Sequence, residues 1–279
     1  MKKIVLLFMS AMALSMAISC NKEDNSPIIE FKDPLVLQAL LDPINENFDK
    51  NGDGQISQKE ANDARSQYGG INLQNWGIRS FDEISYFQNI EGFYLDGNQL
   101  TSIDVSKNTK LKSLSISNNQ LTTLDVSKNT ALEFLDCSAN KLSALDVSKN
   151  TVLESLDCST NKLSALDVSK NTALYSLLCY NTQLMTLDVS KNVALRSLAF
   201  SNNQITSIDL SNNTDLETLH CANNNLTILD LRKNKLLARY ESLVEISGNP
   251  LQKLILSYYG LFPEKLKEKY KDIIEYVYE

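Results

Sequence analysis

The chain has 279 residues, of which 43% are hydrophobic and 22% charged, and its formal net charge is −7. This acidic balance, without a basic stripe, argues against nucleic acid as a partner. It also gives no electrostatic reason to bind an anionic lipid surface. The single histidine, His220, leaves only one residue that could serve a histidine-based catalytic triad.

Residues 1–19 have the composition of a secretory signal peptide. Lys2 and Lys3 precede an uncharged, mostly apolar stretch, which is typical of a cleaved leader rather than a spanning helix. The leader ends in Ala17-Ile18-Ser19-Cys20. This ending is similar to a bacterial lipobox, and the resemblance implies cleavage before Cys20 and lipidation of that residue. Ordinary secretion with Cys20 left free is the alternative.

Residues 20–33 are interpreted as a lipidated tether. Lys22-Glu23-Asp24 directly follows Cys20 and Asn21, and it looks like the surface-export tag of Bacteroidota-type lipoproteins. The resemblance implies an outer-membrane protein that is lipid-anchored and surface-exposed; the alternative is a solvated charged tether. Removal of the leader leaves 25 basic against 34 acidic side chains, a net charge of −9. Any membrane link is therefore expected to run through the lipid alone.

Residues 34–69 are expected to form a small helical cap around an oxygen-rich loop. The loop resembles an EF-hand calcium loop at every ligand position, with Gly54 at the sharp turn. The resemblance implies side-chain, carbonyl and water-mediated oxygen ligands, with the last residue bidentate. The metal-ligand positions are Asp49, Asn51, Asp53, Gln55, Ser57 and Glu60.

The residues flanking this loop favour helices over Leu35–Phe48, which Pro43 interrupts or starts, and over Gln58–Gln67. A polar turn without metal is the alternative. We expect one structural calcium ion that folds the cap onto the first coil. Some cap is physically required, because an uncovered end coil would expose its core.

Residues 70–257 contain a 21-residue sequence repeat in seven copies. A degenerate first coil, which includes Leu73 and Trp76, precedes these copies. Phe81, Tyr86 and Phe87 are expected to fill the core between cap and repeats. The repeats begin at Ile90, Leu111, Leu132, Leu153, Leu174, Leu195 and Leu216.

Each repeat predicts two short extended segments. In the third copy Leu135 and Cys137 lie two residues apart and share one face, while Phe134 and Asp136 share the other. A second alternation follows, with Leu145 and Val147 inward. An asparagine marks the turn between the two segments, where its side chain can bond backbone groups. This column holds Asn98, Asn119, Asn140, Asn161, Asn203, Asn224 and Asn249, with Thr182 as the exception.

The phrase Leu-x-x-Leu-x-(Cys/Ile/Leu)-x-x-Asn-x-Leu resembles the leucine-rich-repeat family in its short bacterial variety, like internalin-type proteins with cysteine in the repeat. The resemblance implies an α/β solenoid, a horseshoe or right-handed coil of parallel short strands with helical caps. It further implies binding through the outward residues of the first strand in each copy. Those positions hold Tyr94, Phe134, Tyr175, Leu178, Tyr180 and His220. Scattered surface apolar residues are the alternative interpretation of this set.

Four cysteines occupy one inward column: Cys137, Cys158, Cys179 and Cys221. Parallel thiols about 5 Å apart on neighbouring strands are poorly oriented for a disulfide's torsion of about 90°. We therefore expect buried free thiols. A straight ladder also cannot converge on a tetrahedral metal ion.

Seven aspartates form an outward column in the second segment, and lysines three residues later offset their repulsion in most copies. The favoured interpretation is a polar corner with local hydrogen bonds; metal or ligand binding is the alternative. The column consists of Asp104, Asp125, Asp146, Asp167, Asp188, Asp209 and Asp230.

Residues 258–279 are expected to form a C-terminal cap. Pro263 opens an apparent amphipathic helix over Glu264–Tyr278, in which Leu266, Tyr270 and Ile273 share one side with other apolar residues.

The chain lacks a nucleophile motif and a glycine-rich phosphate loop, so no enzymatic activity is expected. The sequence and the family resemblance together predict a non-enzymatic surface protein that binds a protein ligand in adhesion. The alternative is an accessory outer-membrane lipoprotein that binds glycans or assembles with an uptake complex.

Overall fold

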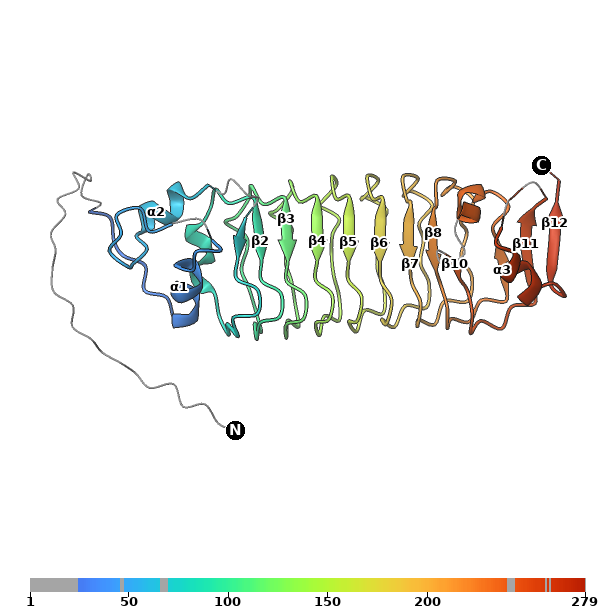
Figure 1. The fold of residues 1–279 in the computed structure, drawn as a ribbon, viewed down its shortest axis with the longest axis horizontal. Helices are drawn as coiled ribbons and strands as arrows, with labels where there is room; N and C mark the ends of the chain where they lie inside the picture. Colours follow the sequence, from blue (N-terminus) through green and yellow to red (C-terminus); the bar gives the residue numbers. More distant parts are fainter. Residues whose placement is uncertain are drawn as a thin grey trace, which may run out of the picture.

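The structure, a computed structural model, describes residues 25–45, 48–65, 70–239, 244–258, 260 and 262–278. These residues form an elongated solenoid with an N-terminal cap at one end and a C-terminal cap at the other (Figure 1). Cys20 and the Lys22-Glu23-Asp24 segment lie outside the described residues. Within the described part, no helix is long and apolar enough to span a membrane.

One parallel sheet runs along the solenoid, and each coil contributes one short strand to it (Figure 1). Neighbouring strands pair without crossovers until the end, where β10 follows β8. The strands are β1 (Ile71–Asn72), β2 (Gly92–Tyr94), β3 (Ser113–Ser115), β4 (Phe134–Asp136), β5 (Ser155–Asp157), β6 (Ser176–Leu178), β7 (Ser197–Ala199), β8 (Thr218–His220) and β10 (Val244–Glu245).

The inward and outward alternation predicted for each coil is confirmed. In strand β4 and just after it, Leu135 and Cys137 point inward and are fully buried, whereas Phe134 points outward and is 39% exposed. Val147 is fully buried, and Asp146 beside it is exposed. Each coil thus covers the core of the next, which is the packing logic of a solenoid.

The turn asparagines tie neighbouring coils together. Asn140 accepts the Leu121 N–H through Oδ1 at 2.9 Å, and its Nδ2 donates to the carbonyls of Ile116 and Cys137 at 3.0 and 3.1 Å. An asparagine can satisfy buried backbone donors and acceptors at once, which explains its recurrence at this turn.

A second buried asparagine row was not recognised from the sequence. Each member lies within the Ser-Lys-Asn-Thr corner or its variants, and each donates from Nδ2 to two backbone carbonyls of preceding coils, as Asn150 does to Val126 and Asn129. The available signal was that this asparagine recurs in every copy while its neighbours vary. The row consists of Asn108, Asn129, Asn150, Asn171, Asn192, Asn213 and Asn234.

The N-terminal cap is helical, but both helices are shorter than expected. Helix α1 spans Pro34–Leu40 and helix α2 spans Gln58–Asp63. Helix α1 stops before Pro43 because the residue preceding a proline is disfavoured in the α region. Helix α2 stops because Ala64 adopts an extended ψ of 129°.

Aromatic residues fill the junction between cap and repeats. The Phe81 ring lies 5.9 Å from the Phe87 ring and 6.2 Å from the Phe93 ring, measured between centroids. Phe81 and Phe87 are buried as predicted, whereas Tyr86, in the short 3-10 helix η1 (Asp82–Tyr86), is 37% exposed. The prediction of Tyr86 as a core residue was therefore wrong.

The C-terminal cap, expected over residues 258–279, differs from the single helix predicted for Glu264–Tyr278. A second parallel sheet forms in the order β12–β11–β9, and η2 (Lys235–Arg239) follows β9 in the chain. Its strands are β9 (Ile228–Asp230), β11 (Lys253–Ser257) and β12 (Ile274–Val277). Helix α3 covers only Glu264–Lys269. Residues 274–277 are β-branched or aromatic apart from Glu275, and pairing with β11 decides their conformation.

The prediction of buried free thiols is confirmed. Cys137, Cys158, Cys179 and Cys221 are all unpaired and fully buried. Burial raises the pKa of the Cys179 thiol to about 12 and raises the pKa of the other three thiols as well. The thiolate is the reactive form of cysteine, so these side chains act as inert apolar filler.

Candidate interaction surface and calcium loop

The outward side chains of the strands form what we call the sheet face, which comprises the outward residues of β2 to β8 and the residues flanking each strand. Its backbone is fixed by parallel pairing on both sides, as in Asp136, which lies in register between Ser115 and Asp157. Neighbouring strands are spaced by about 4.8 Å. The sheet face is therefore a rigid surface on which side chains occupy defined columns.

All six residues predicted to bind a ligand lie on the sheet face, but they do not form one cluster. Tyr175, Leu178 and Tyr180 belong to one coil and lie before, at the end of and after β6. Phe134 opens β4, two strands away, and His220 closes β8, two strands away on the other side. Tyr94, at the end of β2, lies about 19 Å from Leu178 at this strand spacing.

Tyr175, Leu178 and Tyr180 form the central patch of the sheet face. The Tyr175 side chain is 46% exposed, and Leu178 and Tyr180 are half-buried. Tyr175 also lines a shallow depression together with Ala194, Arg196 and Asp215. This patch therefore combines apolar area with charged groups at its margin, as the anchor regions of protein interfaces do.

Two carboxylates on the sheet face, one beside the central patch and one a strand further away, were not recognised as candidate site residues from the sequence. Asp136 and Asp157 lie in register on β4 and β5, and Asp157 pairs in register with Leu178 on β6. Burial, with a further contribution from Asp136, raises the pKa of the Asp157 carboxyl above its usual value, although hydrogen bonds from Ser159 oppose this shift. Their outward position in the strand was the signal that could have identified them.

The aspartate column forms the expected polar corner. In each copy the carboxylate accepts a backbone N–H two residues later, as Asp146 does from Ser148 at 2.8 Å. Hydrogen bonds from Ser148, and more weakly the charge of Lys149, lower the pKa of the Asp146 carboxyl. These local hydrogen bonds stabilise the turn in each coil, which explains why the aspartate recurs.

The loop from Asp49 to Glu60 folds around its own carboxylates. Asp49 accepts the N–H groups of Gly52 at 2.7 Å and of Gly54 at 2.8 Å, one with each carboxylate oxygen. Gly52 and Gly54 adopt φ values of +77° and +81°, which glycine tolerates without strain. Asn51 and Asp53 each accept a backbone N–H two residues later, and the Asn51 amide donates to the Asp53 carboxylate at 2.9 Å.

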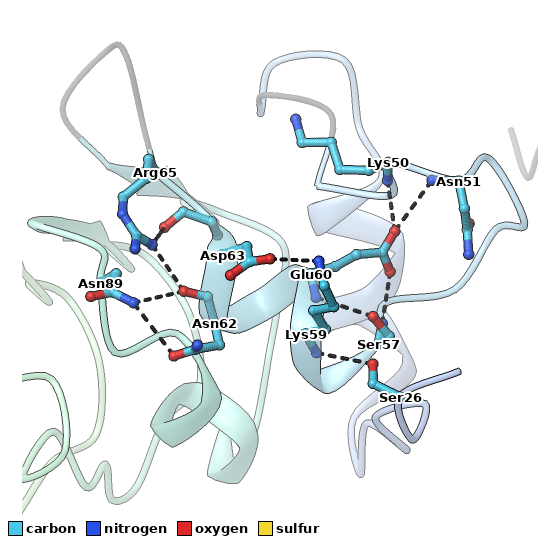
Figure 2. Close-up of polar contacts among 11 residues, drawn as sticks. Ser26, Lys50, Asn51, Ser57, Lys59, Glu60, Asn62, Asp63, Arg65 and Asn89 are labelled. Atoms are coloured by element: carbon cyan, nitrogen blue, oxygen red, sulfur yellow. Dashed lines mark hydrogen bonds and ion pairs between the residues drawn. The ribbon is translucent and has the colours of Figure 1, made fainter. Parts of the chain in front are cut away.

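The Glu60 carboxylate reaches back into this loop (Figure 2). One oxygen accepts the Lys50 N–H at 2.8 Å, and the other accepts the Ser57 N–H at 2.9 Å. The Ser57 hydroxyl in turn accepts the Glu60 N–H, which completes a capping box at the start of α2. Asp49 and Glu60 are only 7% and 6% exposed.

The donor set of this loop fits calcium, a hard cation that prefers oxygen ligands. Asp49, Asn51, Asp53 and Glu60 carry side-chain oxygens at the spacing of a calcium loop, and the glycine turns have the required sign of φ. In the described conformation the oxygens accept backbone N–H groups. Accordingly, no group of three or more His, Cys, Asp or Glu side chains in the described residues is arranged to hold a metal ion.

The loop connects the N-terminal segment with the solenoid. Ile56 accepts the Ile29 N–H at 2.9 Å, and Gln58 donates its N–H to Pro27 at 2.8 Å. On the far side of α2, the Asn89 amide donates to the Asn62 carbonyl at 2.7 Å (Figure 2). The loop therefore lies between residues 27–29 and the first coils.

Comparison with known proteins identifies the architecture. A family model described as Leucine Rich repeats (2 copies) matches residues 109–150. The functional domain of InlJ from Listeria monocytogenes, whose structure includes a cysteine ladder, is 33% identical with a TM-score of 0.65. The alignment covers 75% of this chain and 47% of the InlJ chain. The chain is a parallel β-solenoid whose coils match those of leucine-rich-repeat proteins.

Two further structures share this leucine-rich-repeat fold. Internalin C2 from Listeria monocytogenes is 19% identical with a TM-score of 0.50, over 79% of this chain and 86% of its own. YopM, a leucine-rich effector protein from Yersinia pestis, is 23% identical with a TM-score of 0.56, over 67% and 51% of the two chains. No curated protein sequence gives a significant match.

Leucine-rich-repeat solenoids of this kind are typically scaffolds for protein interaction, and solenoids in general present extended binding surfaces. The present solenoid spans 47% of the InlJ domain that it matches. The sheet face varies from coil to coil: Phe134 occupies a position at which other coils carry glycine, serine or threonine, and the column of Asp157 and Leu178 also holds tyrosine, serine, alanine and histidine.

Proposed function

We propose that this solenoid is a non-enzymatic binding protein that engages a protein ligand through its sheet face, in adhesion or contact between cells. The observation that carries the proposal is the central patch of Tyr175, Leu178 and Tyr180 beside Asp157 on a rigid parallel sheet. Aromatic and aliphatic anchors held by a rigid backbone bind at a low entropic cost.

The test compares two aspartate substitutions within one coil. Leu178→Asp places a charge in the central patch, and Met185→Asp places the same charge outside the sheet face, where Met185 is 63% exposed. Binding to the surface proteins of candidate target cells is measured for both variants. We expect Leu178→Asp to weaken binding at least tenfold, the equivalent of about 1.4 kcal/mol.

Met185→Asp should bind like the wild type. Equal loss in both variants would indicate a general effect of added charge, and unchanged binding by Leu178→Asp would reject the central patch as the binding surface. Thermal unfolding of both variants controls for loss of the fold.

A glycan ligand, with or without assembly into an outer-membrane uptake complex, is the second candidate. Tyr175 and Tyr180 lie in one coil, and Tyr175 exposes nearly half of its surface. Aromatic rings bury a large area in a contact, and such rings can stack on sugars. Binding to a glycan array that is lost in Tyr175→Ala, together with no binding to surface proteins, would favour this second function.

We further propose that the chain is a surface-exposed outer-membrane lipoprotein anchored only through Cys20. The leader, the lipobox-like ending and Lys22-Glu23-Asp24 support this proposal. Protease treatment of intact cells tests it, with Lys22, Glu23 and Asp24 replaced by alanine in a matched strain. Cleavage of the wild type and protection of the variant are expected, whereas protection of both would indicate a periplasmic protein.

Finally, we propose that Asp49, Asn51, Asp53, Gln55, Ser57 and Glu60 hold one structural calcium ion. The ion would supply positive charge to a loop that carries three carboxylates within twelve residues, those of Asp49, Asp53 and Glu60. In this role Glu60 would orient the start of α2, and the loop backbone would hold residues 27–29 through Ile56 and Gln58.

A further inference from the structure

The outer strands of the two sheets differ in how their edges are closed. At the N-terminal end, the Asn45 side chain closes the edge of β1, because its Oδ1 accepts the Asn72 N–H at 2.7 Å and its Nδ2 donates to the Asn72 carbonyl at 2.8 Å. Strand β12 is the outer strand of the second sheet and lies at the C-terminal end of the solenoid (Figure 1). Its only partner strand is β11. Strand β12 therefore presents an open edge.

The backbone groups of β12 alternate between β11 and the open edge. Leu254 in β11 donates its N–H to the Ile273 carbonyl at 2.9 Å. In a parallel pair, alternate residues bond to the partner strand, so the odd-numbered residues of β12 face β11. The N–H and carbonyl groups of Ile274, Tyr276 and Tyr278 therefore point away from β11.

The composition of β12 favours pairing with a further strand. Proteins commonly protect open edges with lysine, proline or a bulge. Ile274, Tyr276 and Val277 are instead β-branched or aromatic, which suits a strand. Glu275, the single charged residue of β12, forms an ion pair with Lys253 at 2.6 Å. The edge is thus close to neutral, although the net charge of the chain is −7.

Three tyrosine rings extend this surface beside the edge. The Tyr258 ring stacks on the Tyr278 ring, with centroids 4.3 Å apart, and meets the Tyr276 ring edge-on at 6.3 Å. The three residues are 52%, 69% and 44% exposed, in the order Tyr258, Tyr278 and Tyr276. Since an aromatic side chain can bury about 150–250 Å², these rings leave on the order of 300 Å² per chain available for a contact.

We propose that two copies of this chain pair through β12, in antiparallel orientation about a two-fold axis at Tyr276. The two three-stranded sheets then become one sheet of six strands. A two-fold interface requires a self-complementary surface, and the outward groups of Ile274, Tyr276 and Tyr278 provide one. Tyr276 bonds to its counterpart in the second copy, and Ile274 of each copy bonds to Tyr278 of the other.

Charge and area agree with a second copy as the occupant. In this register Glu275 lies opposite Val277 of the other copy, so like charges do not meet directly. The rings and strand edges of two copies together bury an area of at most about 1,200 Å², the size of weak and transient interfaces. The dimer is therefore reversible. It does not depend on the proposed function, because β12 belongs to the second sheet and not to the sheet face.

Cysteine crosslinking in cells that carry the full-length protein tests this pairing. Opposite residues of a hydrogen-bonded antiparallel pair have Cα atoms about 5.5 Å apart, which is within the range of disulfides. Tyr276→Cys should therefore give a disulfide-linked dimer under a mild oxidant, and the wild type should give none. Tyr278→Cys is the matched control. This position is more exposed, but the two-fold axis displaces its two copies by about 14 Å along the strands, so we expect at least a tenfold lower yield.

The double variant I274C/Y278C tests the register and covers the case in which Tyr276→Cys does not fold. Its cysteines lie opposite each other between copies, so it should crosslink, whereas neither of its single variants should. A dimer yield from Tyr278→Cys equal to that from Tyr276→Cys would overturn the inference. So would the lack of a dimer from both Tyr276→Cys and I274C/Y278C. The proposed function fails separately, because Leu178→Asp combined with Tyr276→Cys should lose ligand binding and still give the dimer.

Discussion

At the scale of single residues, the row of turn asparagines from Asn98 to Asn249 bonds neighbouring coils together, and Thr182 interrupts it. The Thr182 hydroxyl donates to the Asn203 Oδ1 at 2.6 Å or to the Cys179 carbonyl at 3.0 Å. This hydroxyl does not replace the asparagine side-chain amide of the other coils, which accepts a backbone N–H of the preceding coil and also donates to a carbonyl of that coil. In the other coils the asparagine Oδ1 accepts a leucine or isoleucine N–H of the preceding coil, but the buried Leu163 N–H has no acceptor among the described residues.

Thr182→Asn is therefore expected to stabilise the protein. The new amide would accept the Leu163 N–H and donate to the Cys158 carbonyl, as Asn161 does for the coil before. We expect a gain of about 1–2 kcal/mol in the free energy of unfolding, since an unsatisfied buried donor costs about this much. Urea denaturation measures it. The converse variant Asn161→Thr should lose at least as much, and no change in both variants would contradict this account of the row.

Asp157 and Asp146 are expected to affect stability in opposite directions. Burial raises the pKa of the Asp157 carboxyl, so its ionised form destabilises the fold, and Asp157→Asn should raise the thermal midpoint at neutral pH. This difference should close as the pH falls through the raised pKa. Hydrogen bonds from Ser148 lower the pKa of Asp146, so its carboxylate stabilises the fold until the pH falls through that lowered pKa.

Thermal unfolding of both variants between neutral and acidic pH measures these effects. Asp146→Asn should lower the midpoint at neutral pH and approach the wild type in acid. Equal pH profiles for the two variants would show that burial of Asp157 has no influence on stability.

At the scale of elements, the two ends of the solenoid are capped in different ways. The N-terminal cap places α1 and α2 against the first coils, and its loop from Asp49 to Glu60 bonds to residues 27–29. The C-terminal cap continues the second segment of the coil as β11 and β12, and α3 lines a groove together with β10. One cap thus depends on a polar loop and the other on strand pairing.

Calcium is expected to stabilise the N-terminal cap. Binding stabilises the folded state by RT ln(1 + [L]/Kd), which is about 0.4–1.4 kcal/mol for millimolar calcium at the dissociation constants of about 10⁻⁴–10⁻³ M that extracellular calcium modules have. Millimolar calcium should therefore raise the thermal midpoint of the wild type and slow proteolysis near residues 26–30. Glu60→Gln should lose this response, while Glu264→Gln, on the exposed surface of α3, should keep it. An equal response in both variants would rule out this loop as the site.

The elements differ in how far the sequence alone could predict them. Each coil repeats its inward residues at strand spacing, so the sheet, the buried thiols of the Cys137 column and the turn role of Asn140 could all be inferred from the repeated pattern. The C-terminal cap could not, because Leu266, Tyr270 and Ile273 fit a helical spacing, and only pairing of Ile274 with Leu254 selects a strand. The carboxylates Asp136 and Asp157 were overlooked because a single copy does not show which outward residues become neighbours.

At the scale of the whole molecule, the solenoid is a stack of similar coils. Its aspartate corner is the same in every coil, and its sheet face differs between coils. The aspartate column is the same in every coil and is accounted for by its bonds to residues such as Ser148. The sheet face changes from coil to coil and gathers Tyr175, Leu178 and Tyr180 at its centre. The residues that repeat in every coil therefore build the scaffold, and we expect the residues of the sheet face that differ between coils to provide the binding surface.

The most direct test of the sheet face as the binding surface is photo-crosslinking in cells that carry the full-length protein. A photoreactive residue replaces Tyr180 in the central patch, and in a matched strain it replaces Met185 of the same coil. We predict a discrete crosslinked protein from position 180 and none from position 185. Crosslinks of equal yield from both positions, or from position 185 alone, would contradict the account.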